Sequence, residues 1–339
     1  RYPGTILFFR LGDFYETFDD DAKLVAEELQ ITLTSKPMGK DLRVPLAGVP
    51  YHAIDQHVAK LVARGYRVAI CEQLADPSEV KGLVPRDVVR IVTAGTVTSE
   101  ASLEAGRPNY LGAFVRRGRD AALALADVTT GEVRVVPGED ALVEAGRSPV
   151  AELLLEDLAD APQLTVPAVQ RPLLSDLAVE AEIARQFGEH AQAGLLPGPA
   201  AAAAVAHLLV YLRETYPAAL GAIQRIRTEG TEAELLVDDR TLRNLDVFPA
   251  PGKTASLLAV IDRSRTAMGT RLLRHWLSHP LRDRAALEAR LDAVAWAVGR
   301  PIERERAQAV LRGIPDLARL AGKVGARSAS PRDLAALRD

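Results

Sequence analysis

The chain has 339 residues, of which 48% are hydrophobic and 26% are charged, and its formal net charge is −3. This composition excludes an intrinsically disordered chain, and the length exceeds what one hydrophobic core organises comfortably, so two or three domains are expected. The net charge gives no general argument for nucleic-acid binding, although residues 265–339 carry 15 basic against 8 acidic side chains. The only cysteine, Cys71, excludes an internal disulfide and favours a reducing compartment. The longest apolar stretch, residues 200–212, is too short to cross a bilayer.

The first hundred residues predict a compact α/β domain with a mixed sheet. Apolar runs bounded by turn residues indicate strands, and an apolar face at helical spacing or acids in a first turn indicate helices. A segment with a proline near each end is predicted to be a loop. The predicted elements are a strand at 6–10, a helix at 19–29, the loop at 45–52, a helix at 54–64, and strands at 66–71 and 88–92.

The middle of the chain predicts a second α/β domain. Three strand-like segments joined by good turn chemistry open it, at 110–116, 121–128 and 132–136. A strand at 153–155 and a helix at 200–215 are expected among the elements that follow. Three antiparallel strands followed by alternating strands and helices suggest a ribonuclease H-like topology, by analogy of fold alone.

From Arg240 onward the pattern is all-α. Asp283 is predicted to cap a helix with apolar residues at near-heptad spacing, and Ser330 to cap another. The chain stops soon after that second start, so we expect a sequence cut from a larger protein. The predicted division is a first domain at 1–98, a linker at 99–108, a ribonuclease H-like domain at 109–228, and a truncated helical domain at 229–339.

Phe14 and Glu16 are the candidate functional residues. They are two positions apart, so both side chains point to the same side wherever the backbone is extended. An aromatic wedge can enter a base stack, and a carboxylate beside it can accept a hydrogen bond from an unstacked base. On spacing alone, a core position for Phe14 and a solvated surface position for Glu16 stay open as alternatives.

Seven motifs occur in order along the chain: Gly12–Phe18, Pro45–Ala53, Val68–Gln73, Val89–Thr96, Asp127–Glu132, Thr241–Leu245 and Met268–Leu277. With these motifs the chain resembles the N-terminal part of the MutS family of bacterial DNA mismatch-repair proteins. The resemblance implies a mismatch-recognition domain, then a ribonuclease H-like connector, then the start of a helical lever or core domain.

The resemblance also implies a function, the recognition of mispaired or unpaired bases in duplex DNA to initiate mismatch repair. Phe14 would stack on the mispaired base from the minor groove, and Glu16 would accept a hydrogen bond from it. Opening a base step in this way costs about a few kcal/mol, and a mispaired step deforms more easily. Weaker candidates for DNA contact are Lys36, Leu46, Tyr51, Arg86 and Arg90, for which loop-anchoring or solvated roles remain open.

Further expectations concern the intact protein. The resemblance implies that the intact protein is a homodimer that holds DNA as an ATP-dependent clamp. Its ATPase domain would use ATP and Mg²⁺. We expect no enzyme activity and no cofactor in this chain, because that domain is missing from it. Repair proteins such as MutL are expected partners, through the connector, and the bacterial cytoplasm, at the nucleoid, is the expected location.

Two rival functions stay open at this stage. One is a divalent-metal nuclease on the connector with Asp127 and Glu132 as ligands, although no third acid is apparent. The other is a protein-interaction module that binds no DNA. The segment 249–254 ends in Lys-Thr but lacks the leading glycine of a phosphate-binding loop, so no nucleotide site is predicted there. The six histidines show no zinc-ligand spacing, and His207 is expected to be a hydrogen-bonded core or interface residue.

Overall fold

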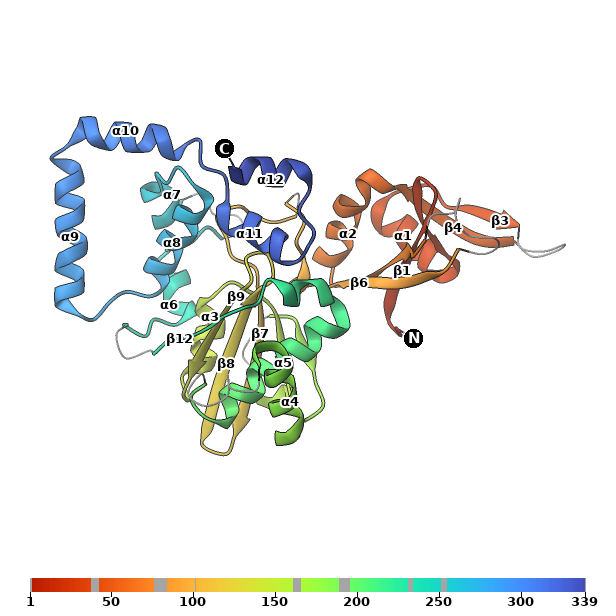
Figure 1. The fold of residues 1–339 in the computed structure, drawn as a ribbon, viewed down its shortest axis with the longest axis horizontal. Coiled ribbons are helices and arrows are strands. Elements are labelled where there is room, and N and C mark those ends of the chain that lie inside the picture. The colour runs from red at the N-terminus through yellow and green to blue at the C-terminus, as the bar shows by residue number, and fades with distance from the viewer. Residues whose placement is uncertain are drawn as a thin grey trace. The chain divides into compact units, whose positions relative to one another are not determined.

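The computed structural model describes residues 2–37, 43–75, 84–100, 102–160, 166–188, 196–230, 234–250 and 255–338. The chain forms two compact units, one of Arg1–Leu103 with Tyr211–Pro217 and one of Glu104–Val210 with Ala218–Asp339 (Figure 1). Within the described ranges, no helix has both the length and the apolar character needed to cross a membrane. The finer division into three domains stays a prediction.

The first unit is built on a six-stranded mixed sheet with the strand order β3-β4-β2-β1-β5-β6. The pairing of β1 with β5 is parallel, and the other pairings are antiparallel. Its elements are β1 (Thr5–Leu11), β2 (Phe14–Phe18), α1 (Asp19–Leu29), β3 (Thr34–Pro37), β4 (Arg43–Pro50), α2 (Ile54–Ala63), β5 (Arg67–Gln73) and β6 (Arg86–Val92). The predicted helices at 19–29 and 54–64 and the predicted strands at 6–10, 66–71 and 88–92 are therefore confirmed.

The core of this unit lies between the sheet and the two helices. Phe8 and Val68 from the sheet belong to one buried cluster with Val25 of α1 and Leu61 of α2. Gly65 ends α2 with a φ of +90°, a conformation that glycine adopts without strain. Cys71 is buried and free, and burial raises the pKa of its thiol.

The prediction of a loop at 45–52 is wrong for most of that segment. Residues 43–50 form β4, which pairs with β3 on one side and with β2 on the other. The two prolines are tolerated because pairing with β2 runs only from Leu46 to Pro50. Pro45 therefore lies beyond the ladder on that side, and Pro50 is the last residue of the strand.

The second unit contains another six-stranded sheet, with the order β11-β10-β7-β8-β9-β12. The three predicted strands are confirmed, since β7, β8 and β9 pair in antiparallel fashion, while β10, β11 and β12 each join by parallel pairing. The helix α3 packs on β7, β8 and β9. The elements are β7 (Tyr110–Arg117), β8 (Asp120–Asp127), β9 (Glu132–Pro137), α3 (Ala141–Arg147), β10 (Val150–Leu155), β11 (Ala168–Gln170), α4 (Asp176–Phe187), α5 (Pro199–Thr215) and β12 (Ile226–Thr228).

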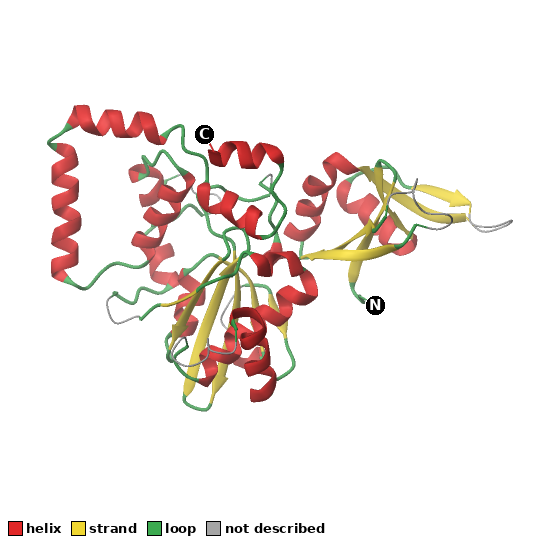
Figure 2. Cartoon of the chain, in the orientation of Figure 1, coloured by secondary structure: helices red, strands yellow, loops and turns green. Residues whose placement is uncertain are grey.

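From Asp239 onward the described chain forms helices joined by loops (Figure 2). The predicted caps are confirmed: the Asp283 side chain accepts from the Ala285 amide, and Ser330 Oγ accepts from the Asp333 amide. The apolar residues at heptad spacing on α9 are exposed, from 40% at Leu287 to 66% at Leu291. These helices are α6 (Asp239–Asn244), α7 (Leu257–Ile261), α8 (Ala267–Ser278), α9 (Arg284–Val298), α10 (Pro301–Leu311), α11 (Leu317–Gly325) and α12 (Pro331–Arg338).

Thr17 of β2 offers a test of the packing of the first unit. Its side chain is fully buried, and its hydroxyl has no hydrogen-bond partner among the described residues. We expect Thr17→Val to raise the free energy of unfolding by about 1 kcal/mol, because an isosteric methyl group removes an unpaired polar atom. Chemical denaturation measures this.

Thr96 supplies the matched control. It is equally buried, but its hydroxyl accepts from the Thr93 amide at 2.9 Å. Thr96→Val should therefore lower the free energy of unfolding by about 1–3 kcal/mol. Equal effects of the two substitutions would contradict the assignment.

Candidate nucleic-acid interface

Phe14 lies directly after the tip of the β1–β2 hairpin. Leu11 and Phe14 are paired, so only Gly12 and Asp13 form the turn. Gly12 has a φ of +60°, which suits the first central position of a tight hairpin. The ring of Phe14 is held at this tip with 47% of its residue surface exposed.

The alternation of β2 separates two faces of the sheet. Tyr15 and Thr17 point into the core and are 6% and 0% exposed. Phe14, Glu16 and Phe18 therefore share the opposite face, as the two-residue spacing predicted. A plain core position for Phe14 is excluded by its exposure.

The strand register brings further side chains to this face. Glu16 is paired with Phe9 of β1 and with Gly48 of β4, and Phe18 is paired with Leu46. The rings of Phe9 and Phe18 meet edge to face with centroids 6.0 Å apart. We call this surface the outer face; its members are Phe9, Phe14, Glu16, Phe18, Lys36 and Leu46.

Glu16 is a carboxylate set among apolar groups. Its side chain is only 20% exposed, and Lys36 Nζ lies 3.4 Å from its Oε2. A Cβ built on Gly48 would lie 3.5 Å from Glu16 Cγ and 3.9 Å from Phe14 Cδ1. The glycine thus leaves the flank of both side chains open.

Tyr51 and Arg10 brace the hairpin. The Tyr51 amide donates to the Asp13 carbonyl at 2.9 Å, and the Arg10 guanidinium lies 4.3 Å from the Tyr51 ring centroid. Arg10 also donates to the Gly12 carbonyl. Arg10 was not among the residues predicted from the sequence, although a charged residue at the end of an apolar strand and beside a turn was a usable signal.

Arg86 and Arg90 are not part of the outer face. Both lie on β6, at the edge of the sheet opposite β3. Arg90 donates to the Thr96 carbonyl, its guanidinium stacks 4.2 Å from the Tyr216 ring centroid, and burial lowers its pKa. These contacts give Arg90 a packing role, and phosphate contact by either arginine stays a prediction.

The remaining candidates have local structural partners. Asp127 is buried and accepts from the amide of Thr129, closing the turn after β8. Burial raises the pKa of Glu132. Within the part of the chain that the structure describes, no group of three His, Cys, Asp or Glu side chains could hold a metal ion.

His207 is buried, and its Nε2 lies 2.8 Å from Glu156 Oε1, as expected of a hydrogen-bonded core histidine. His190 and residues 251–254 of the Lys-Thr segment lie outside the described residues.

The chain is similar over its whole length to known DNA mismatch repair proteins. A family model for MutS domain I matches residues 1–101, and one for MutS domain III matches residues 240–339. The DNA mismatch repair protein MutS of Symbiobacterium thermophilum is 41% identical over an alignment that covers all of this chain. The chain belongs to the MutS family. The MutS proteins of Dehalococcoides mccartyi and Pelotomaculum thermopropionicum are 38% and 39% identical over the whole chain. The chain spans 41% of the length of each of these three relatives.

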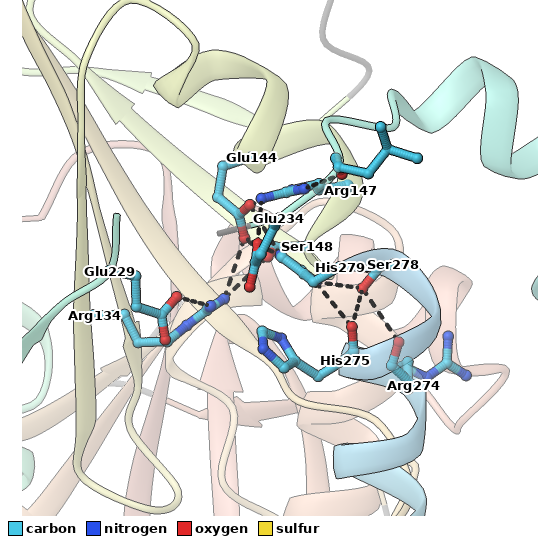
Figure 3. Close-up of polar contacts among 11 residues, drawn as sticks. Arg134, Glu144, Arg147, Ser148, Glu229, Glu234, Arg274, His275, Ser278 and His279 are labelled. Carbon is cyan, nitrogen blue, oxygen red and sulfur yellow. Dashed lines mark hydrogen bonds and ion pairs between the residues drawn. The ribbon is translucent and has the colours of Figure 1, made fainter. Parts of the chain in front are cut away.

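A second polar cluster joins the segment that matches MutS domain III to the sheet before it, within the second unit (Figure 3). Its centre is Glu144 on α3, whose side chain is 1% exposed. Arg134 of β9 and Arg147 of α3 both pair with this carboxylate, and His279 Nε2 lies 3.0 Å from each of its oxygens. His279 follows α8, so one carboxylate ties three elements together.

The outer members of the cluster continue the pairing. Glu229 Oε2 lies 2.6 Å from Arg134 Nη1, and Glu234 Oε2 lies 3.1 Å from Arg147 Nη2. Burial acts to raise the pKa of Glu144, but the hydrogen bond with His279 and the charges of the arginines outweigh it and hold that pKa well below its usual range. The carboxylate is therefore ionised wherever the unit is folded at neutral pH.

A cavity of about 810 Å³ borders this cluster. Two of its arginines, Arg134 and Arg271, are already neutralised by acids, the second by Asp316 at 2.6 Å. Arg225, Arg227 and Arg274 also line the cavity, and we assign it no ligand.

Removal of the central carboxylate tests the cluster. Glu144→Gln leaves two buried arginines without a shared counter-charge, so we expect the second unit to lose about 3–5 kcal/mol of unfolding free energy. Urea denaturation measures the loss. The matched control is Glu288→Gln, since the Arg284–Glu288 pair is exposed on α9, and its effect should stay within about 0.5 kcal/mol. A loss of similar size in the control would contradict a special role for Glu144.

The cluster also predicts a pH dependence. Burial, and then the neighbouring His279 and Arg134, lower the pKa of His275 from 6.5 to about 3. At a pH between these two pKa values, the imidazole of His275 is protonated in the unfolded chain but not in the folded chain. The free energy of unfolding therefore falls as the pH drops through that window. The lowered pKa of Glu144 has the same consequence, a loss of stability as the pH falls. Urea titrations between about pH 4 and about pH 7 measure this dependence, and His275→Gln should make the free energy of unfolding vary less with pH. A variation with pH as steep as that of the unsubstituted chain would contradict the role given to His275.

Proposed function

We propose that this MutS-family chain recognises mispaired or unpaired bases in duplex DNA and so initiates mismatch repair. Phe14 is the wedge that enters the base stack, and Glu16 accepts a hydrogen bond from the unstacked base. The observation that carries the proposal is the outer face, where a half-exposed aromatic ring and a carboxylate stand side by side on one strand.

The physical basis is the ease with which DNA bends. An apolar wedge opens a base step and kinks the duplex, and this costs less where the step is already poorly stacked. The apolar surroundings of Glu16 strengthen any hydrogen bond that it accepts, because water competes poorly there. A matched duplex presents no base donor, so the carboxylate only repels the phosphates. Glu16 is on this view a residue of specificity and not of affinity.

The second sheet supports a ribonuclease H-like connector. In its order β12-β9-β8-β7-β10-β11, the three antiparallel strands β9, β8 and β7 are followed by the two parallel strands β10 and β11, in agreement with the analogy drawn from the sequence. The strand β12 joins the other edge by parallel pairing with β9. The helices from Asp239 onward would then begin the lever or core domain.

Further activities belong to the longer proteins that the chain resembles. We assign to the full-length protein an ATPase domain with ATP and Mg²⁺, a homodimeric clamp on DNA, and repair partners such as MutL. The support is the family membership and the 41% share of the relatives that the chain spans.

Binding of the full-length protein to labelled duplexes tests the proposal, with one duplex carrying a G·T mismatch and the other fully matched. Phe14→Ala should weaken mismatch binding by about 5- to 150-fold, the value of one base–aromatic stack, and abolish the preference. Glu16→Ala should tighten binding to the matched duplex and narrow the ratio of the two affinities. Fluorescence anisotropy measures both.

Leu177→Ala is the control, because Leu177 is 78% exposed on α4 and lies outside the proposed interface. It should change neither affinity. A mismatch preference that survives Phe14→Ala, or affinities for both duplexes that Glu16→Ala leaves unchanged, would overturn the proposed reading mechanism.

A further inference from the structure

The carboxylate of Glu16 already has a partner inside the protein. Lys36 Nζ lies 3.4 Å from Glu16 Oε2 and 6.0 Å from the centroid of the Phe18 ring. Lys36 is the one cation within ion-pair distance of Glu16 among the described residues, and it contacts only one of the two oxygens. Among the described residues, Oε1 therefore has no protein partner.

The position of Lys36 is fixed by the backbone. It lies on β3 opposite Val44 of β4, so its side chain emerges on the face that carries Glu16. Arg43 holds the same end of β3, because its Nε donates to Ser35 Oγ at 2.9 Å. The lysine side chain remains 50% exposed, so it can respond to a bound polyanion.

Resting on the proposed function, we propose that Lys36 is a specificity-determining residue that acts as the internal counter-ion of Glu16. It neutralises the carboxylate on a matched duplex, where no base donates to it, and leaves Oε1 for a base donor on a mismatched one. Lys36 thereby limits how strongly Glu16 rejects matched DNA. It sets the balance between affinity and discrimination.

The sign of the effect follows from charge. Without Lys36, a bare carboxylate faces the phosphates of both duplexes, and both affinities fall. On the mismatched duplex the base donor offsets part of that charge, whereas on the matched duplex nothing does. Removal of Lys36 therefore weakens matched binding more, and the ratio of mismatch to match affinity rises.

A double-mutant cycle in the full-length protein tests this, with the same two duplexes. Lys36→Met should weaken binding to both and raise the affinity ratio by about twofold to fivefold, the range of an exposed ion pair. Lys36→Arg, which keeps the charge, should restore the wild-type ratio. In the Glu16→Ala background, Lys36→Met should weaken both duplexes equally and leave the ratio unchanged.

Lys23→Met is the matched control, because Lys23 pairs with Asp20 on α1, so the same charge and an exposed ion pair are lost away from the outer face. It should leave the ratio unchanged. Equal weakening of both duplexes by Lys36→Met in the presence of Glu16 would make Lys36 a plain phosphate contact and overturn the inference. A ratio that shifts even in the Glu16→Ala background would overturn it as well.

The proposed function fails by a different result, a mismatch preference that Phe14→Ala does not remove. If that result were found, the double-mutant cycle of Lys36→Met and Glu16→Ala could still be measured on the matched duplex alone, and it would report whether the two side chains interact. The two failures are therefore distinguishable.

Discussion

The two-residue period of β2 is the constraint on which the candidate interface depends. Tyr15 and Thr17 are fixed in the core, and this forces Phe14, Glu16 and Phe18 onto the other face. A shift of register by one residue would bury Phe14 and Glu16 and expose Tyr15 and Thr17. The hydrogen bond from Tyr15 to Glu72 secures the register further, and burial with that contact raises the pKa of the phenol to about 12. Phe14 and Glu16 are therefore held in place by the same contacts that stabilise the fold.

The chain contains two kinds of ion pair with different consequences. The pair of Glu16 and Lys36 is half exposed and contributes little to folding, since exposed pairs are worth about 0–1 kcal/mol. Such a weak pair is easily exchanged for a ligand, which suits the response to DNA that we propose for this surface. Glu144 and its arginines are nearly inaccessible, so their mutual attraction cannot be replaced by water. That cluster suits a permanent junction between α3 and the end of α8.

Several parts of the fold could be predicted from the sequence, because their signals are local. Helix caps at Asp283 and Ser330 depend on residues within one turn, and the hairpin at Gly12 depends on its own φ. β4 was missed because its two prolines indicate a loop when considered alone. Pro45 lies just beyond the ladder with β2 and Pro50 is its last residue, and these positions, which make a strand possible, are apparent only once β2 and β3 are in place.

The sequence by itself determined the family motifs, the order of most strands and helices, and the shared side of Phe14 and Glu16. These follow from spacing, turn chemistry and capping among near neighbours. Only the tertiary structure decided which cation accompanies Glu16, that Arg90 packs against Tyr216, and that Glu144 meets His279. Glu144 and His279 are separated by 135 positions in the chain, so no local pattern reports their contact. Pairing between charges depends on where the backbone brings them, and that is fixed by the packing of the whole unit.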